Sequence, residues 1–203
     1  MNPVFDSIAD GLAESGYAVA DQFLSQQEVE SIRQAGGFQT DSEFKKAGIG
    51  NKQSLQIQEG IRGDYIKWLD RNNAPESVRV YLQRLDELIQ YLNRALFLSL
   101  KDFEVHMTVY PIGSFYKRHL DQFKKDDYRK LSVILYLNND WQDSHGGQLR
   151  MYLPGQTKDF LPQAGRLVIF RSDEIEHEVL PATRERLSIT GWVLDRLAEL
   201  KHI

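Results

Sequence analysis

The 203-residue sequence predicts a mostly β protein with flanking α-helices. This is an α+β fold whose core is a jelly roll (double-stranded β-helix) with helices packed on one sheet. Two observations predict it. Apolar residues recur at helical spacing in the first half of the chain. After Lys101 the period changes to two, in short apolar runs separated by turn residues, a pattern typical of sandwiches and barrels.

Three helices are predicted in the first half of the chain. Apolar residues at helical spacing begin at Phe5, and Gly16 is placed to end that helix. The segment Ser25–Glu28 is a capping box, so a second helix should begin there and run to about Gly36. The clearest helix spans 75–98, where one apolar stripe contains Val78, Leu82, Leu85, Ile89, Leu92 and Leu96.

Residues 40–59, between the second and third helices, are polar and show no period. A segment this long inside a compact domain is usually a functional loop or a mobile one. The chain contains no internal repeat, low-complexity tract or linker, so residues 1–203 are predicted to form a single domain. Residues 1–100 would be mainly helical support, and residues 101–195 would form the jelly-roll core.

Seven strands are predicted after Lys101. Turn signals such as Pro111-Ile112-Gly113 separate them, and short strands at this spacing close into a sandwich or barrel. Helices that come before such strands fit a layer packed on one face of it. The predicted strands are 103–110, 115–121, 131–138, 148–153, 167–170, 177–180 and 186–194.

Composition excludes several classes of protein. The chain has no cysteine, which removes disulfides, thiolate nucleophiles and Cys-based metal sites, and favours a reducing, cytoplasmic location. A net charge of −4 argues against a broadly basic nucleic-acid binder. No apolar run approaches the roughly 20 residues that span a bilayer, and the N-terminus lacks the basic region of a signal peptide. We therefore expect no nucleic-acid or membrane partner, and the oligomeric state stays open.

A metal-binding pattern lies in the strand predicted at 115–121. His119 and Asp121 are two residues apart, so they point to the same face of that strand. His177, which follows a polar turn and begins a strand-like segment, qualifies as a third ligand. Two histidines and one carboxylate on one side of a metal are the arrangement of non-haem iron(II) oxygenases. Two alternatives stay open, a solvated charged strand at His119 and a buried His177 bonded to a backbone carbonyl.

Arg186 adds a second kind of signal. In the predicted strand 186–194 it shares one face with Ser188, Thr190 and Trp192. An arginine inside a barrel is costly unless it meets an anion, and a bidentate pair with a carboxylate is the natural solution. Tyr136 could add a hydroxyl to the same carboxylate. A dicarboxylate keto acid bound to metal at one end and to Arg186 at the other would be neutralised at both ends; the alternative is an internal ion pair.

Several segments carry a family resemblance, in one order along most of the chain. They are 16–24, Ile61-Arg62-Gly63-Asp64 followed by Trp68, Tyr110-Pro111, 116–121, 136–141, 146–150 and 177–192. Together they resemble the 2-oxoglutarate-dependent prolyl hydroxylases, particularly the oxygen-sensing animal enzymes and their bacterial counterparts. The turn before His119 is one residue shorter than in some relatives, and residues 40–59 are unlike them, which leaves the substrate open.

The resemblance implies that the protein hydroxylates a prolyl residue in a protein or peptide to 4-hydroxyproline. Iron(II), 2-oxoglutarate and O2 would be required, succinate and CO2 would be coproducts, and ascorbate could serve as reductant. Residues 40–59 would be a mobile lid over the substrate. The implied ligands are His119, Asp121 and His177 for iron, Arg186 and Tyr136 for the distal carboxylate of 2-oxoglutarate, Tyr110 and Trp192 for the rest of the cosubstrate pocket, and Arg62, Asp64 and Tyr116 for the substrate groove.

Other interpretations remain at this stage. The same chemistry could act on a free amino acid or another small molecule. The chain could instead be a non-catalytic, metal-binding jelly roll used as a sensor or interaction module. A zinc hydrolase has less support because the triad has no obvious general base beside it, although Glu176 and Glu178 flank His177. Tyr110 and Trp192 could be plain core aromatics, and Asp64 could merely cap a turn.

Overall fold

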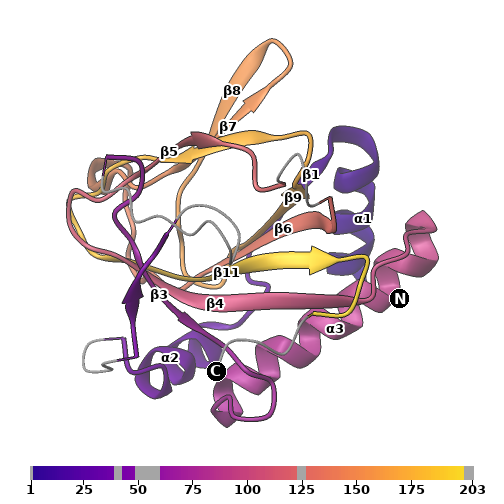
Figure 1. The fold of residues 1–203 in the computed structure, drawn as a ribbon, viewed down its shortest axis with the longest axis horizontal. Coiled ribbons are helices and arrows are strands. Elements are labelled where there is room, and N and C mark those ends of the chain that lie inside the picture. Colours follow the sequence, from indigo (N-terminus) through magenta and orange to yellow (C-terminus); the bar gives the residue numbers. More distant parts are fainter. Residues whose placement is uncertain (1, 39–42, 49–59, 123–126, 199–203) are drawn as a thin grey trace.

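The structure is a computed structural model, and it describes residues 2–38, 43–48, 60–122 and 127–198. Two antiparallel sheets face each other, and helices cover the outer face of the larger one (Figure 1). The interior therefore has two apolar clusters, one between the helices and the larger sheet and one between the two sheets. This architecture confirms the predicted mostly β fold with helices on one sheet.

The first helix ends, and the second begins, where the sequence predicts. Helix α1 spans Pro3–Ser15; the Asn2 side chain accepts a hydrogen bond from Val4 N–H at its start, and Gly16 ends it at a φ of 75°, in the left-handed region that glycine tolerates. Helix α2 spans Gln26–Ala35 and begins with the capping box formed by Ser25 and Glu28.

Helix α3 spans Glu76–Leu96, within the predicted range 75–98. Its apolar stripe faces the larger sheet and the other two helices, so burial of that stripe stabilises the layer. Arg84 Nη2, on α3, lies 2.8 Å from Glu28 Oε1 on α2 and ties the two helices together. The buried residues of α3 are Val78, Tyr81, Leu82, Leu85, Leu88, Ile89 and Leu92.

The larger sheet has the strand order β1-β9-β6-β11-β4-β3-β2. Its centre is β11, which pairs along its whole length with β4, from Arg186 opposite Tyr110 to Leu194 opposite Asp102. Alternate residues of these strands face the helices or the smaller sheet. The strands are β1 Tyr17–Ala20, β2 Lys45–Lys46, β3 Tyr65–Trp68, β4 Asp102–Tyr110, β6 Arg129–Tyr136, β9 Leu167–Arg171 and β11 Arg186–Leu194.

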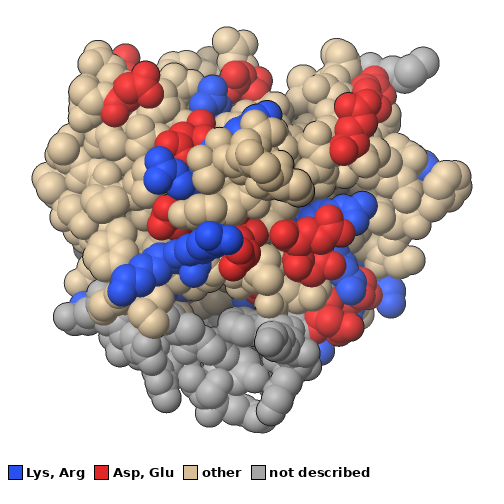
Figure 2. Space-filling model, turned by 90° about the horizontal axis from the view of Figure 1, so that it is seen from above, with Lys and Arg blue, Asp and Glu red and all other residues tan. Residues whose placement is uncertain are grey.

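The smaller sheet has the order β5-β10-β7-β8, and no described helix covers its outer face. That face is accordingly polar, and Figure 2 shows basic and acidic side chains beside one another on this side of the molecule. Its pairs include Arg118–Glu176, Arg150–Asp159 and Tyr152–Glu178. The strands are β5 Tyr116–His119, β7 Leu149–Leu153, β8 Gln156–Phe160 and β10 Glu176–Val179.

The structure corrects the sequence predictions in two places, and it leaves the predicted lid untested. The predicted strand 115–121 ends at His119, so Asp121 lies in a bend beyond it. The period-two pattern does not predict strands β1, β2, β3 and β8. Of the predicted lid 40–59, residues 40–42 and 49–59 lie outside the described residues, and 43–48 contain the short strand β2. Within the described ranges, no helix is long and apolar enough to cross a membrane.

Candidate metal centre

Three potential metal ligands meet between the two sheets. His119, at the end of β5, pairs in register with His177 of β10, and their ring centroids are 4.3 Å apart. Asp121 Oδ1 lies 3.4 Å from His119 Nε2, and Asp121 Oδ2 lies 3.6 Å from His177 Nε2. One ligand atom from each residue lies within 4.8 Å of the others. The structure therefore brings together the three side chains that the sequence singled out.

Backbone carbonyls determine which imidazole nitrogens face Asp121. His119 Nδ1 lies 2.6 Å from the carbonyl of Lys117, and His177 Nδ1 lies 3.1 Å from the carbonyl of Ile175. Because a carbonyl only accepts, each Nδ1 must carry the proton and donate it. In the neutral imidazole, each Nε2 then keeps its lone pair and is directed at the carboxylate, which is the form in which histidine binds a metal.

Burial and neighbouring charge set the protonation states of the ligands. Burial lowers the pKa of His177 to about 4 against the opposing effect of Asp121, so this imidazole is neutral at pH 7. Burial raises the pKa of Asp121, but His177, His119 and Ser132 together outweigh it and hold that pKa well below its usual range. A neutral imidazole beside an ionised carboxylate is ready to bind a cation.

Arg186 is buried inside the jelly roll, and no carboxylate of the described part of the chain pairs with it. Its side chain is only 2% exposed, and no described carboxylate forms a salt bridge with it. Its Nη2 lies 3.4 Å from the Tyr136 hydroxyl, while its Nε has no hydrogen-bond partner in the described part of the chain. The rings of Tyr110 and Tyr136 lie 5.0 and 4.9 Å from its guanidinium carbon. Among the described residues, Arg186 therefore has no internal ion pair of the kind that the sequence left open.

Arg62, Asp64 and Tyr116 form a chain of contacts that ends on His119, a candidate metal ligand. The Arg62 guanidinium donates to both oxygens of Asp64, at 2.7 and 2.6 Å. Its carbon lies 4.3 Å from the centroid of the Tyr116 ring, which stacks on His119 with the centroids 3.6 Å apart. Asp64, fully buried, thus binds Arg62 instead of merely capping a turn.

Trp192 shares a face of β11 with Arg186 but lies at the other end of the strand. Its described ring contacts are with His106 and Trp68, at centroid distances of 5.7 and 6.4 Å, and with Arg129, whose guanidinium carbon lies 3.4 Å from the ring centroid. Its place in a cosubstrate pocket stays a prediction. His106 is 3% exposed, and its Nδ1 has no hydrogen-bond partner in the described ranges.

Two serines that lie next to Asp121 are not among the site residues that the sequence predicts. Ser132 Oγ lies 2.6 Å from Asp121 Oδ2 and 2.9 Å from Ser172 Oγ, and both serines are buried. Ser132 gave a usable signal because it interrupts the apolar run 131–137 and so places a hydroxyl on the inner face of β6. Ser172 follows β9 in a polar turn and gave no such signal.

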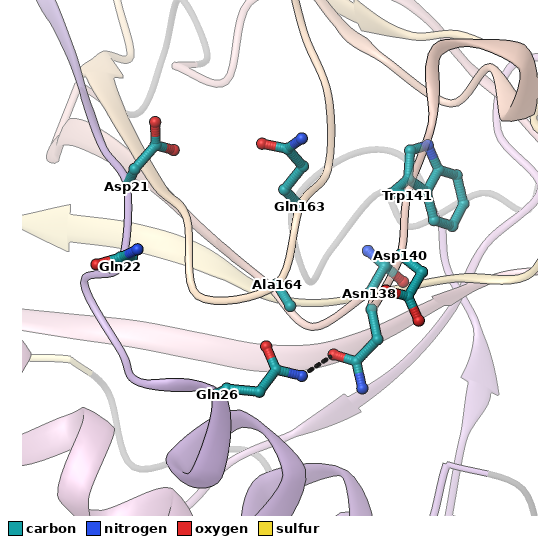
Figure 3. Close-up of a pocket in the computed structure, with 9 residues that line it drawn as sticks. Asp21, Gln22, Gln26, Asn138, Asp140, Trp141, Gln163 and Ala164 are labelled. Carbon is teal, nitrogen blue, oxygen red and sulfur yellow. Dashed lines mark hydrogen bonds between the residues drawn. The ribbon is translucent and has the colours of Figure 1, made fainter.

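A separate cavity of about 500 Å³ shares no lining residue with the triad. Figure 3 shows polar side chains from the turn before α2, from the first residue of α2, from the loop after β6 and from the loop before β9. Gln26 Nε2 donates to Asn139 Oδ1 at 2.7 Å. Asp21 pairs with Arg166, so its charge is already compensated. Among the described residues, the only group of three or more possible metal ligands is the triad, which is why we place the functional site there.

The chain is similar in sequence and in structure to known proteins. Residues 105–194 match the sequence model of the 2OG-Fe(II) oxygenase superfamily. The crystal structure of a Pseudomonas putida prolyl-4-hydroxylase is 43% identical, with a TM-score of 0.86, and the match covers 95% of this chain and 100% of that one. A Trichoplax adhaerens prolyl hydroxylase, in complex with a hypoxia inducible factor peptide, is 27% identical with a TM-score of 0.84, covering 95% and 90%.

Longer animal proteins are also similar. The Caenorhabditis elegans hypoxia-inducible factor prolyl hydroxylase is 30% identical over 95% of this chain, and human Egl nine homolog 1 is 31% identical over 89%. The chain spans only 28% and 44% of the lengths of these two relatives. The comparisons confirm the resemblance that the sequence motifs carried.

Proposed function

The chain belongs to the 2OG-Fe(II) oxygenase superfamily, and we propose that it hydroxylates a prolyl residue in a protein or peptide. Dioxygen and 2-oxoglutarate would be consumed, and succinate and CO2 released. The likeness to a bacterial prolyl-4-hydroxylase over that protein's full length supports this substrate class. The likeness to a relative that binds a hypoxia inducible factor peptide supports a macromolecular substrate, and an oxygen-sensing role belongs to the same proposal.

The donor set of the triad fits iron(II). Two imidazole Nε2 atoms and one carboxylate lie close together, and this is the donor set that non-haem iron(II) oxygenases use. We assign His119, Asp121 and His177 as the ligands. Bound iron(II) and 2-oxoglutarate would supply the oxidising chemistry, with one oxygen atom of O2 entering the substrate C–H bond and the other entering succinate.

The buried, uncompensated Arg186 is the observation that carries the proposal. A guanidinium without a counter-ion inside a protein is strongly unfavourable, and an incoming carboxylate would remove that penalty with charge-assisted hydrogen bonds. Tyr136 would donate its hydroxyl to the same carboxylate, and Tyr110 would pack beside it. A non-catalytic metal-binding module has no use for this arrangement.

On the substrate side, we assign positioning roles to Arg62, Asp64 and Tyr116. Asp64 fixes the Arg62 guanidinium, which holds the Tyr116 ring against His119. A peptide bound near Tyr116 would therefore be placed relative to the metal by a chain of direct contacts. We keep Trp192 as a proposed cosubstrate-pocket residue and residues 40–59 as a proposed lid.

The decisive experiment is hydroxylation of a whole-cell lysate, followed by mass spectrometry. We expect a gain of 16 Da on specific prolines with the wild-type protein plus iron(II) and 2-oxoglutarate, and none with Asp121→Ala. Under anaerobic conditions, iron(II) plus 2-oxoglutarate should give a weak visible charge-transfer band that His119→Ala abolishes. A band without any modified proline would favour a small-molecule substrate, and the absence of a band would contradict the oxygenase activity of this chain.

The remaining expectations belong to the same proposal. We propose a single domain over residues 1–203, with its helical support in 1–100 and its catalytic core in 101–195. A cytoplasmic location, the lack of a nucleic-acid or membrane partner, and ascorbate as reductant stay predictions. They would be tested by fractionation of the source cell and by turnover with and without ascorbate.

A further inference from the structure

Asp121 differs from the other two ligands in how the fold holds it. His119 and His177 lie on paired strands, whereas Asp121 lies beyond the end of β5. Its backbone is held from the larger sheet instead: the neighbouring Gln122 N–H donates to the carbonyl of Ser172 at 3.1 Å, and Arg129 Nη1 donates to the carbonyl of Asp121 at 3.4 Å. These two backbone hydrogen bonds do not fix the orientation of the Asp121 carboxylate, which depends on contacts of the side chain.

Ser132 and Ser172, here called the serine pair, make the contact that orients it. Ser132 Oγ lies 2.6 Å from Asp121 Oδ2 and 2.9 Å from Ser172 Oγ. An ionised carboxylate only accepts, so Ser132 must donate its single proton to Asp121. Ser132 can then only accept from Ser172, which fixes the direction of both hydrogen bonds: Ser172 donates to Ser132, and Ser132 donates to Asp121.

We propose that the serine pair is a positioning device for the metal ligand Asp121, with Ser172 acting through Ser132. By holding Oδ2, Ser132 fixes the carboxylate with Oδ1 3.4 Å from His119 Nε2 and Oδ2 3.6 Å from His177 Nε2. The two serines are 1% and 0% exposed, so bulk water does not replace a lost hydroxyl without rearrangement. This inference rests on the metal-binding part of the proposed function and not on its substrate.

Manganese(II) is a suitable probe because its binding can be followed by electron paramagnetic resonance without turnover. Hydrogen-bond partners of metal ligands typically contribute 10- to 100-fold to metal affinity. We expect Ser132→Ala to weaken manganese(II) binding by about that factor and Ser172→Ala to weaken it less, because Ser132 still donates. Ser132→Thr, which keeps the hydroxyl, should retain the wild-type affinity.

The double variant gives the sharpest test of a series arrangement. If Ser172 acts only through Ser132, adding Ser172→Ala to Ser132→Ala should cost no further affinity. Ser77→Ala is the matched control: this Oγ in α3 is buried, has no partner among the described residues and lies outside the site. It should leave manganese(II) affinity unchanged, and thermal unfolding of each metal-free variant would establish that it is folded.

Three results would overturn the inference: Ser132→Ala binding manganese(II) as tightly as Ser77→Ala, Ser132→Thr binding as weakly as Ser132→Ala, or Ser172→Ala costing the same with and without Ser132. Failure of the proposed function looks different. If the wild-type protein bound manganese(II) no better than Asp121→Ala, both the role of the serine pair and the proposed function would be contradicted. If the variants showed the expected order of manganese(II) affinities but no proline was modified in the lysate, only the proposal of a prolyl substrate would be contradicted.

Discussion

Arg186 is the residue at which stability and function oppose each other. Its guanidinium is buried, its Nε has no described partner, and only the Tyr136 hydroxyl lies within hydrogen-bonding distance of its Nη2. An unsatisfied buried polar group costs about 1–3 kcal/mol, and more when it is charged. The fold therefore carries an unfavourable charge that a bound carboxylate would compensate.

Arg186→Met should change stability and cosubstrate binding in opposite directions. Without cosubstrate, we expect the free energy of unfolding to rise by about 1–3 kcal/mol, because an apolar side chain of similar length replaces the uncompensated charge. The affinity for 2-oxoglutarate should fall by at least about 30-fold, equivalent to about 2 kcal/mol. Urea unfolding and calorimetric titration of the manganese(II)-loaded protein would measure the two quantities.

Arg166→Met is the control for that prediction. Arg166 Nε already lies 2.5 Å from Asp21 Oδ1, away from the triad, so its loss should not stabilise the protein or alter 2-oxoglutarate binding. A loss of stability in Arg186→Met would mean that the guanidinium is compensated in solution without cosubstrate.

His106 is a second buried group whose ionisation affects stability. Burial lowers its pKa from 6.5 to about 3, with further effects from Arg62, Asp64, Glu104 and Arg129. The unfolded chain takes up a proton below about pH 6.5, whereas the folded chain does so only near pH 3. Stability is therefore complete above pH 6.5 and falls as the pH decreases towards 3.

His106→Met should remove this part of the acid sensitivity. Relative to pH 7, we expect the wild type to lose about 2–3 kcal/mol more than the variant at pH 4.5, since each pKa unit is equivalent to about 1.4 kcal/mol. Urea unfolding at both pH values, with EDTA present, would show the difference. Parallel pH curves for the two proteins would mean that His106 titrates normally in the folded state.

At the scale of elements, the sequence predicted the helices and strands that have a clear local pattern of capping residues or apolar residues. The capping box at Ser25 and the apolar stripe of α3 placed two helices, and strand 186–194 was found with its correct ends. The missed strand β8 is polar and mostly exposed at a sheet edge, so only its pairing with β7 defines it. Spacing and resemblance predicted the three candidate metal ligands, and the structure brings their side chains together. The contact of Ser172 with Ser132 and the Arg62–Asp64 pair are contacts that the spacing does not reveal, whereas Ser132 interrupts the apolar run 131–137.

Substitution of two glycines by alanine would distinguish two causes of lost stability, steric crowding at Gly191 and an unfavourable backbone conformation at Gly155. A Cβ at Gly191 on β11 would lie 2.0 Å from the carbonyl oxygen of Glu104 on β4, so the strands would have to separate. Gly155, in the β7–β8 turn, has a φ of 74° and open space around it. We expect Gly191→Ala to cost about 3 kcal/mol through overpacking and Gly155→Ala about 1 kcal/mol through the left-handed backbone alone.

Urea unfolding would compare the two variants, and 2-oxoglutarate titration would show whether the damage reaches the site. Only Gly191→Ala should weaken cosubstrate binding, because β11 carries Arg186 and β4 carries Tyr110 opposite it. Equal losses of stability in the two variants would mean that β4 and β11 tolerate the added methyl group.

At the scale of the whole molecule, the candidate metal site joins the two sheets. His119 and His177 belong to the smaller sheet, while Asp121 is held by Ser132 of the larger one. A bound metal ion would therefore tie β5 and β10 to β6 across the interior. This arrangement gives metal binding a local consequence in addition to its effect on overall stability.

We expect manganese(II) to slow amide hydrogen exchange most in β5 and β10. At about 100 times the dissociation constant, binding to the folded state contributes about 2.7 kcal/mol. A local opening that separates His119 or His177 from Asp121 breaks the metal site and so loses this stabilisation. Such openings therefore become rarer when the metal is bound. Opening of β8, the outer strand of the smaller sheet, leaves the triad intact, so its exchange by local opening should not change. Asp121→Ala should show no metal effect in any of these strands, whereas equal slowing in β8 and β5 would mean that the metal does not join the sheets.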